Sequence, residues 1–232
     1  MPSVDADNRI LYIKSMTFED WGLIPYATAY ERQLSLVAER ISDKISDTVV
    51  FVEHPAVYTL GVRPEAEAHL TANEAFLKKN KIEVIHTNRG GDITHHAPGQ
   101  LVIYPIIKLG HKDLHRYLRD LEEVIIRALG NLGLASTRVK DKTGVWVAHG
   151  AQGKDHKKIA AIGVAVKQWV TYHGAALNVT NDLSLFDGIV PCGLKDCQVT
   201  SLKEELKQNT PTMAEVKDAV QDVWTEMMLS SQ

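Results

Sequence analysis

The sequence predicts an α+β fold, or a mixed α/β sandwich, in a single domain. Segments with strand and helix patterns are interspersed along the chain, without the strict βαβ rhythm of a doubly wound parallel sheet. The 232 residues are enough for one large core, and 44% of them are hydrophobic while 24% are charged, as in ordinary globular proteins. We therefore treat residues 1–232 as one domain and expect residues 1–9 to be flexible.

Eight segments have the composition of β-strands, with β-branched and apolar residues between turn signals. They cover residues 10–13, 48–52, 57–60, 82–86, 100–107, 144–148, 159–166 and 170–179. Pro105 cannot donate a ladder hydrogen bond, so we expect it to break its strand or to lie at an edge. The last three strands follow one another directly, and the polar residues 149–157 predict a hairpin loop.

Four helices are predicted from their start signals and hydrophobic spacing. Residues 71–74 and 212–215 are capping boxes, and Asp113 caps a long amphipathic helix. Pro25 suits the first turn of the first helix. The apolar residues of that helix, at helical spacing, are Tyr26, Tyr30, Leu34, Val37 and Ile41.

Composition and charge exclude several classes of protein. The net charge of −3 lacks the basic excess of a general nucleic-acid binder. The apolar stretch 159–166 is far shorter than the ~20 residues that span a bilayer, and residues 1–9 do not resemble a signal peptide. Cys192 and Cys197 cannot make a disulfide framework. We expect a cytoplasmic protein with reduced thiols and neither a nucleic-acid nor a membrane partner.

Residues 89–100 form the first segment with unusual chemistry. The adjacent glycines after Arg89 let the backbone approach a ligand, and the guanidinium is suited to an anion or a carbonyl oxygen. In an extended chain Thr94 and His96 share one face and His95 takes the other, which argues against a metal site on the two histidines. The alternative interpretation is a surface hairpin with incidental histidines.

Two further segments combine an ionisable residue with unusually small neighbours. Lys158 leads into an apolar strand in which Ala161 and Gly163 leave room for an alkyl chain. His173 precedes a second run of small residues. The alternatives are a core strand opened by a solvated lysine and a core histidine with satisfied hydrogen bonds.

The fourth segment places Cys192 between a proline and a glycine, a rigid turn that can present a sulfur atom at a pocket. A thiol becomes a good nucleophile when a cation favours its thiolate, and Lys158 is a candidate. The two residues are 34 positions apart, and composition alone does not show that they meet. Cys197 is not flanked by proline and glycine, and we expect it to be a small buried hydrophobic residue.

Together these segments closely resemble the lipoyl(octanoyl) transferases, the octanoyltransferases of lipoate synthesis. The resemblance runs from about Tyr26 to about Leu202. It is carried by Arg89, Gly90, Gly91, Thr94, His96, Pro98, Gly99, Gln100, Tyr104, Gly144, Trp146, Lys158, Ala161, Gly163, His173, Gly174, Asn178, Pro191, Cys192 and Gly193, and upstream by residues 53–55 and 57–61. The family's fold resembles that of lipoate ligases and biotin protein ligases, which implies an α+β domain with a central mixed sheet flanked by helices.

The resemblance implies transfer of an octanoyl group from octanoyl-acyl carrier protein to a lysine of a lipoyl domain. The implied acceptors are the lipoyl domains of 2-oxoacid dehydrogenase complexes and the H protein of glycine cleavage. Cys192 matches the nucleophile that forms an acyl thioester, and Lys158 the lysine that activates it, as a base or only as a charge. Thioester exchange requires neither ATP nor a metal, so we expect no cofactor and no metal ion. We also expect the protein to be a monomer.

The resemblance also implies the acyl pocket. Its residues are Arg89, Gly90, Gly91, Asp92, Ile93, Thr94, His95, His96, Ala161, Ile162, Gly163, His173, Gly174, Ala175 and Ala176. The chain departs from the family pattern at His95, usually an aromatic, at Ala97, usually glycine, and at Ala175, often a larger aliphatic. These changes affect the loop after Arg89 and the width of the acyl slot. The segment 149–157 is a long polar insertion without an assigned function.

Three other functions remain open. An ATP-dependent lipoate or biotin protein ligase of the same fold would form an adenylate without carrier protein. A zinc hydrolase would use His96, His173 and Cys192, although no short metal-binding pair anchors such a site. A binding module for acyl chains would never turn over.

Overall fold

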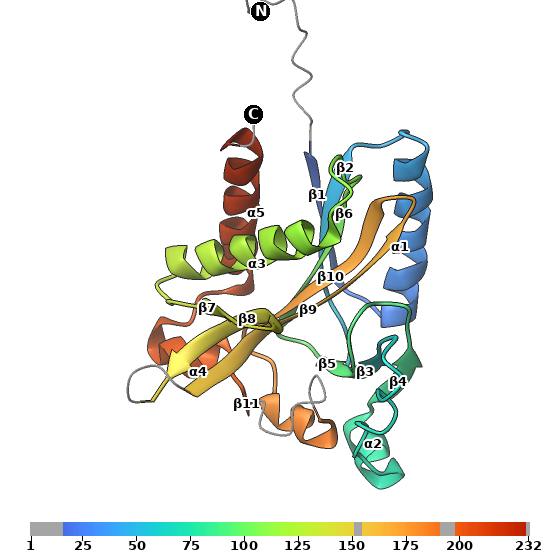
Figure 1. The fold of residues 1–232 in the computed structure, drawn as a ribbon. Helices are drawn as coiled ribbons and strands as arrows, with labels where there is room; N and C mark the ends of the chain where they lie inside the picture. Colours follow the sequence, from blue (N-terminus) through green and yellow to red (C-terminus); the bar gives the residue numbers. More distant parts are fainter. Residues whose placement is uncertain (1–15, 151–154, 191–197, 231–232) are drawn as a thin grey trace, which may run out of the picture.

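The structure, a computed structural model, describes residues 16–150, 155–190 and 198–230 (Figure 1). A mixed eight-stranded sheet has the strand order β1-β2-β6-β10-β9-β8-β7, with β11 paired to β9. The pairs β1–β2 and β11–β9 are parallel, and the others are antiparallel. The strands are β1 (Met16–Leu23), β2 (Asp47–Glu53), β6 (Gln100–Ile106), β7 (Thr137–Val139), β8 (Lys142–His149), β9 (Asp155–Lys167), β10 (Val170–Asn178) and β11 (Gln198–Val199).

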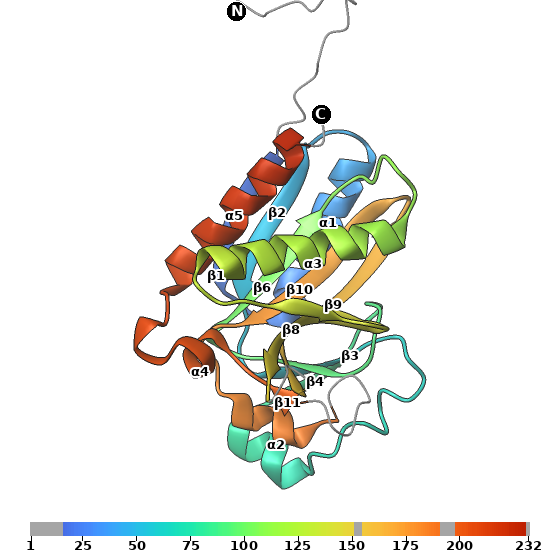
Figure 2. The same cartoon turned by 60° about the vertical axis from the view of Figure 1, so that its left-hand side comes forward.

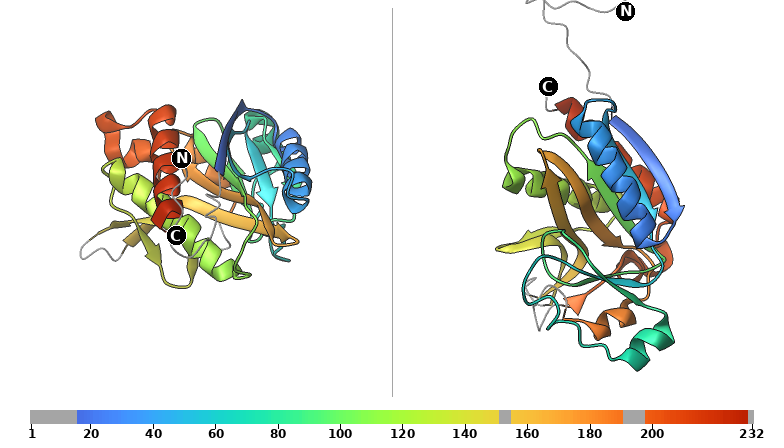
Figure 3. Two further views of the ribbon diagram at one scale, coloured as in Figure 1. Left: turned by 90° about the horizontal axis from the view of Figure 1, so that it is seen from above. Right: turned by 90° about the vertical axis from the view of Figure 1, so that its right-hand side faces the viewer.

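Helices cover both faces of this sheet (Figures 2 and 3). Helix α1 (Tyr26–Ile41) packs on β6 and β10 from one side. Helices α3 (Leu114–Asn131) and α5 (Met213–Ser230) pack against each other on the opposite side. The predicted architecture, a central mixed sheet flanked by helices, is confirmed.

A smaller sheet lies beside the large one, with the order β4-β3-β5. Its strands are β3 (Val57–Leu60), β4 (Glu83–His86) and β5 (Thr94–His96). Helix α2 (Glu74–Asn80) and the 3-10 helix η2 (Leu183–Gly188) pack with it around Tyr58, Ile93 and Phe186. The chain then continues through α4 (Leu202–Leu206) and η4 (Lys207–Asn209) to α5.

The main core fills the space between the large sheet and the pair α3 and α5. Leu121, Ile125 and Leu129 of α3 meet Val220 of α5 and Leu177 of β10 there, and all five are almost fully buried. Both predicted caps of these helices are present. The Asp113 side chain accepts a hydrogen bond from the Arg116 N–H at 3.0 Å, and in the capping box of α5 the Thr212 N–H donates to Glu215 at 2.7 Å.

On α1 the buried face differs from the predicted one. Tyr26 and Val37 are buried, as the spacing predicted, but Leu34 is 37% exposed and Gln33 is fully buried. The Gln33 side chain accepts a hydrogen bond from the backbone N–H of His173 at 2.8 Å. A polar contact therefore orients the helix, and hydrophobic spacing cannot reveal such a contact.

The prediction for Pro105 was wrong about its place in the sheet. Strand β6 lies between β2 and β10, and Pro105 pairs with Val49 of β2. The ladder from β6 to β10 stops at Ile103, so the missing N–H falls where no ladder bond is required. The Thr171 hydroxyl donates to the Pro105 carbonyl at 2.6 Å and bridges the gap.

Several boundaries also differ. The side chain that caps α2 is Asn73, which accepts from the Phe76 N–H at 2.9 Å, rather than Thr71. The hairpin loop predicted over 149–157 is shorter, because β8 extends to His149 and β9 begins at Asp155. The sequence did not predict β1, β7, β11 or α4.

Two predictions, a strand at 10–13 and flexibility over 1–9, lie outside the described residues. In the described part of the chain, no helix is both long enough and apolar enough to span a bilayer.

Two apolar residues of α1, Val37 and Leu34, give a matched test of this burial. We expect Val37→Ala to lower the free energy of unfolding by about 2 kcal/mol, because two methyl groups leave a packed site. Leu34→Ala should change it by less than about 0.5 kcal/mol, since Leu34 is exposed. Urea unfolding of both variants measures the difference, and equal losses would contradict the observed helix orientation.

Candidate active site

A cavity of about 420 Å³ lies where the smaller sheet meets β9 and β10 of the large one. Its volume is within the range of small-molecule pockets, roughly 300–1,000 Å³. Lys158 and every predicted pocket residue except His95 line it. The fold therefore gathers into one place residues that are spread over 88 positions of sequence, from Arg89 to Ala176.

The loop from Arg89 to Gly91 joins the two sheets. The Gly90 N–H donates to the Val164 carbonyl of β9 at 2.8 Å. A Cβ on Gly163 would lie 2.5 Å from the Gly90 carbonyl oxygen, so this approach requires glycine. Gly91 has φ +92°, a conformation that glycine adopts without strain.

Arg89 fixes this loop from within. Its side chain is buried, and its guanidinium donates to the Thr59 hydroxyl at 3.1 Å, to the Thr59 carbonyl and to the Gly90 carbonyl at 3.2 Å. The guanidinium was predicted to hold an anion or a carbonyl oxygen. The carbonyls that it holds here belong to the chain itself.

Small residues of adjacent strands form the floor of the cavity. Gly174 pairs with Gly163, and Ala176 pairs with both Ala161 of β9 and Val102 of β6. These residues present only main-chain atoms and methyl groups to the cavity. This arrangement suits an unbranched hydrocarbon chain lying along the sheet.

A β-bulge brings Lys158 to the cavity. The register between β8 and β9 shifts between Val145 and Trp146, so that Val145 faces Ala160 and Trp146 faces Lys158. As a result, Ile159 and Ala160 both enter the main core, and Lys158 and Ala161 both line the cavity. Strict alternation would have pointed Lys158 to the same side as Ala160.

Lys158 is buried, with only 5% of its surface exposed, and its ammonium contacts an aromatic ring. Its Nζ lies 4.7 Å from the centre of the Trp146 ring, a cation–π distance. This contact sets where the charge sits beside the cavity floor.

The two histidines that line the cavity, His96 and His173, are hydrogen-bonded on both ring nitrogens. His96 donates from Nδ1 to Gln100 at 2.8 Å and accepts at Nε2 from the Thr59 hydroxyl at 3.4 Å. His173 donates from Nε2 to Asn88 at 2.9 Å and accepts from the Tyr26 hydroxyl at 3.3 Å. These bonds occupy the nitrogens that the zinc hypothesis requires.

Burial keeps these histidines neutral. Desolvation, together with repulsion from Arg89, lowers the pKa of His173 to about 3. Desolvation, with repulsion from His54, lowers the pKa of His96 well below its usual value. Desolvation lowers the pKa of His54, which accepts from the Tyr104 hydroxyl at 2.8 Å, to about 4. The two histidines of the cavity wall, His96 and His173, thus carry no charge at neutral pH.

His95 does not line the cavity, which corrects the pocket prediction for this residue. It faces away from His96, as alternation on a strand requires, and its ring lies 5.3 Å from those of Tyr58 and Phe186. The imidazole therefore occupies an aromatic box in the small core, where burial lowers its pKa to about 4.

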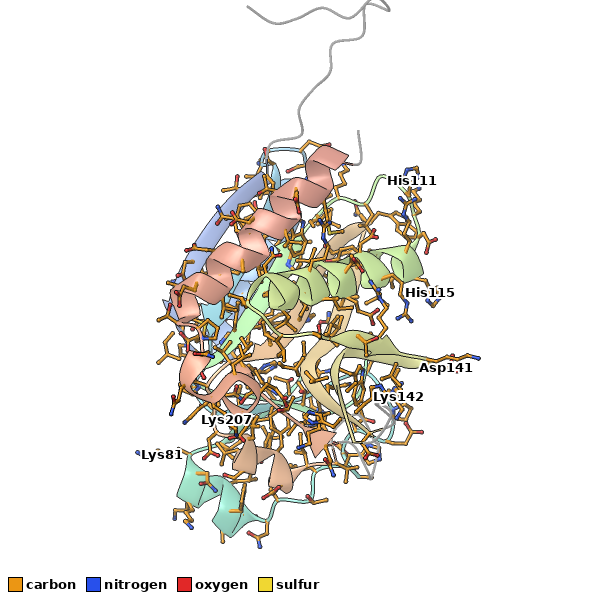
Figure 4. All side chains as sticks on the ribbon, turned by 90° about the vertical axis from the view of Figure 1, so that its left-hand side faces the viewer. Lys81, His111, His115, Asp141, Lys142 and Lys207 are labelled. Carbon is orange, nitrogen blue, oxygen red and sulfur yellow. The ribbon has the colours of Figure 1, made fainter. Side chains whose placement is uncertain are left out.

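The outer part of the cavity comes from residues that the sequence did not indicate. Leu114 and Leu118 of α3 line it, as do Asp141 and Lys142. Figure 4 shows Asp141 and Lys142 at the outer end of the β7–β8 hairpin, on the side of the molecule where α3 begins. No local motif marks these residues, because only the fold brings the two elements together.

Comparison with known proteins identifies the family. The pattern of the lipoyl protein ligase A/B catalytic domain matches residues 25–225. An octanoyltransferase of Rubrobacter xylanophilus is 50% identical over 191 residues, which cover 82% of this chain and 83% of the relative. One of Chloroflexus aurantiacus is 46% identical over 209 residues, which cover 89% and 91%. The chain belongs to the octanoyltransferase family.

Solved structures agree with this fold. A putative lipoate protein ligase of T. acidophilum with bound lipoic acid has a TM-score of 0.69 at 19% identity, covering 92% of this chain and 86% of its own. The biotin protein ligase of Aquifex aeolicus, in complex with biotin and ATP, has a TM-score of 0.52 at 14% identity, covering 93% and 70%. The octanoyltransferase family thus shares its architecture with both kinds of ligase.

Cys192 and Cys197 lie outside the described residues, whereas Val190 and Val199, on either side of them in the sequence, are described. At one end the Val190 N–H donates to the His69 carbonyl at 2.8 Å, and the His69 ring contacts Asp92 of the cavity at 2.9 Å. At the other end Val199 pairs with Lys158 in a parallel ladder. In this member of the octanoyltransferase family, Val199 thus pairs with a cavity residue, and Val190 is connected to one through His69.

The buried histidines predict an acid-labile fold. Since His54, His95 and His173 have pKa values of about 4, 4 and 3 against 6.5 in the unfolded chain, the unfolded chain binds more protons below pH 6.5. Stability is then complete above pH 6.5 and falls as the pH is lowered, by up to about 1.4 kcal/mol per unit for each histidine.

Urea unfolding between pH 8 and about pH 5.5 measures this slope. His95→Phe should reduce it, because one of the buried histidines with a lowered pKa is removed. His86→Gln is the matched control, since that side chain is 70% exposed and should leave the slope unchanged. An unaltered slope in His95→Phe would contradict the assignment.

Proposed function

We propose that this protein transfers an octanoyl group from octanoyl-acyl carrier protein to a lysine of lipoyl domains, through a thioester on Cys192. The observation that carries the proposal is the cavity with an apolar floor of small residues beside Lys158. Relatives that are 50% and 46% identical over most of the chain are octanoyltransferases, which supports the same acyl group here. The acceptors proposed are the lipoyl domains of 2-oxoacid dehydrogenase complexes and the H protein of glycine cleavage.

The cavity is suited to an unbranched acyl chain. Its floor is lined by Gly163, Gly174, Ala161 and Ala176, so an extended hydrocarbon chain can lie against the backbone of β9 and β10. Each methylene removed from water there contributes roughly 0.8 kcal/mol. The neutral histidines of the inner wall add no charge that would oppose such a chain.

The position of Cys192 in the chain supports its role as nucleophile. It follows Val190 by two residues in the sequence and precedes Gln198 by six. Val190 is fixed to His69, and the chain that leaves the segment pairs with Lys158. The described residues on both sides of Cys192 in the sequence are thus connected to residues of the cavity, which supports the proposal that Lys158 favours its thiolate.

The reaction proceeds by two acyl transfers. In the first, the Cys192 sulfur attacks the thioester carbonyl, the bond to the carrier sulfur breaks, and the thiol proton ends on the carrier thiol. In the second, the ε-amine of the acceptor lysine attacks the new thioester, the bond to Cys192 breaks, and a proton from the amine returns to the thiol. We assign to Lys158 the stabilisation of the thiolate and the exchange of these protons.

Ligase chemistry has weaker support. The lipoate and biotin ligases resemble this chain only in fold, at 19% and 14% identity, whereas the octanoyltransferases resemble it in sequence. Formation of an acyl adenylate from free lipoate and ATP, without carrier protein, would favour the ligase function over the proposed one.

Intact-protein mass spectrometry tests the nucleophile. After mixing with octanoyl-acyl carrier protein, wild type should gain one octanoyl group, and lipoyl domain should remove it. Cys192→Ala should gain none and lose transfer, because no thiol attacks the thioester. Cys197→Ser is the control and should behave like wild type. Transfer at the wild-type rate by Cys192→Ala would overturn the thioester intermediate.

Substitution of Lys158 tests the activating group. Lys158→Ala should slow acylation by roughly a hundredfold or more and raise the pH at which iodoacetamide alkylates Cys192, because the thiolate loses its cation. Lys158→Arg separates the two roles, since it keeps the charge but does not exchange a proton at neutral pH. If Lys158→Arg restores both the wild-type pH of Cys192 alkylation and octanoyl transfer, Lys158 acts only through its charge. If it restores the alkylation pH but not transfer, Lys158 also transfers protons. An unchanged alkylation profile in Lys158→Ala would exclude Lys158 as the activating cation.

A further inference from the structure

Trp146 is the residue of β8 directly opposite Lys158 on β9. It is 1% exposed, and it does not belong to the main core, which holds its neighbours Val145 and Val147. The face of its ring meets the Lys158 ammonium at 4.7 Å. The indole therefore fixes the direction in which the lysine points.

The backbone of Gly144 supports the other side of the same lysine. A Cβ at Gly144 would lie 3.2 Å from Cε and 3.5 Å from Nζ of Lys158, and 2.6 Å from the Ala160 carbonyl oxygen. Gly144 has φ +123°, which disfavours other residues. The end of the lysine side chain thus passes directly over the main chain at this glycine.

A buried carboxylate holds Gly144 in turn. Glu122 of α3 is fully buried, and its Oε1 accepts a hydrogen bond from the Gly144 N–H at 3.0 Å. Its Oε2 accepts from Arg119 at 2.6 Å and from Arg138 at 3.0 Å. A buried carboxylate with these partners costs desolvation free energy, and an apolar residue would fill the same space at lower cost.

We propose that Trp146 and Glu122 are positioning residues for Lys158, Trp146 through its ring and Glu122 through the backbone of Gly144. Lysine has a flexible four-carbon stem, so its amine stays beside the cavity only where the surroundings restrict it. The β-bulge in β9 directs the Lys158 side chain toward the cavity. The Trp146 ring and the Gly144 backbone restrict the position of its amine. The Glu122 carboxylate holds β8, the strand to which Trp146 and Gly144 belong. This inference rests on the proposed role of Lys158.

The test measures octanoyl transfer from octanoyl-acyl carrier protein by the full chain. Trp146→Leu removes the ring face, and Glu122→Leu removes the acceptor for the Gly144 N–H. Both should lower kcat by roughly tenfold or more with KM for the carrier changed by less than about twofold, because the lysine is misplaced while the acyl floor is intact. Both should also move the pH profile of Cys192 alkylation toward that of Lys158→Ala.

Conservative and matched variants separate positioning from general damage. Trp146→Phe keeps a ring face and Glu122→Gln keeps an acceptor oxygen, so each should restore most of kcat. Glu123→Leu is the matched control, because Glu123 also bonds Arg138, at 2.7 Å, but makes no bond to Gly144. It should retain the wild-type kcat.

A double-mutant cycle gives the decisive result. In the Lys158→Ala background, Trp146→Leu and Glu122→Leu should cause no further loss of kcat, because the residue they position is gone. Additive losses, or an alkylation profile like that of wild type, would overturn the inference. If Trp146→Leu does not fold, judged by its thermal unfolding, Glu122→Leu and its cycle decide alone.

The same experiments distinguish this inference from the proposed function. Impaired transfer in Lys158→Ala together with wild-type kcat in Trp146→Leu and Glu122→Leu would overturn the positioning roles and leave the proposed function standing. Wild-type transfer in Lys158→Ala would overturn the role of Lys158 and the inference with it.

Discussion

The cavity depends on one contact between main chains, the hydrogen bond from the Gly90 N–H to the Val164 carbonyl. It joins the smaller sheet to β9, and the glycines at 90 and 163 let the two backbones come this close. Arg89 then ties the same loop to Thr59 on β3. Because main-chain atoms connect the smaller sheet to β9, no side chains are needed to fill the space next to this contact. A cavity therefore remains between the two sheets.

The electrostatics follow from the same arrangement. A polar wall beside an apolar floor is compatible with a hydrocarbon only if the wall carries little charge. His96 and His173 meet this condition, because each satisfies its ring nitrogens with neighbouring side chains and is too deeply buried to hold a second proton at neutral pH. The guanidinium of Arg89 is engaged with the carbonyls of Thr59 and Gly90. The Lys158 ammonium, in contrast, contacts the Trp146 ring.

Sequence reasoning succeeded where the determining contacts are local. The cap at Asp113 and the opposite faces of His95 and His96 depend on residues within four positions, and both are confirmed. It failed where a distant partner decides. Gln33 is buried because His173 needs an acceptor, and Leu114 lines the cavity because α3 begins beside the β7–β8 hairpin. The site of Cys192 lies outside the described residues, and its assignment still rests on the family resemblance.

The bulge in β9 explains why two separated sequence motifs belong together. Lys158 reaches the cavity only because β8 and β9 shift register beside Trp146, so the lysine motif depends on the motif that begins at Gly144. The bond from the Gly144 N–H to Glu122 holds β8 two residues before Trp146, so α3 also contributes to the placement of this pair of strands.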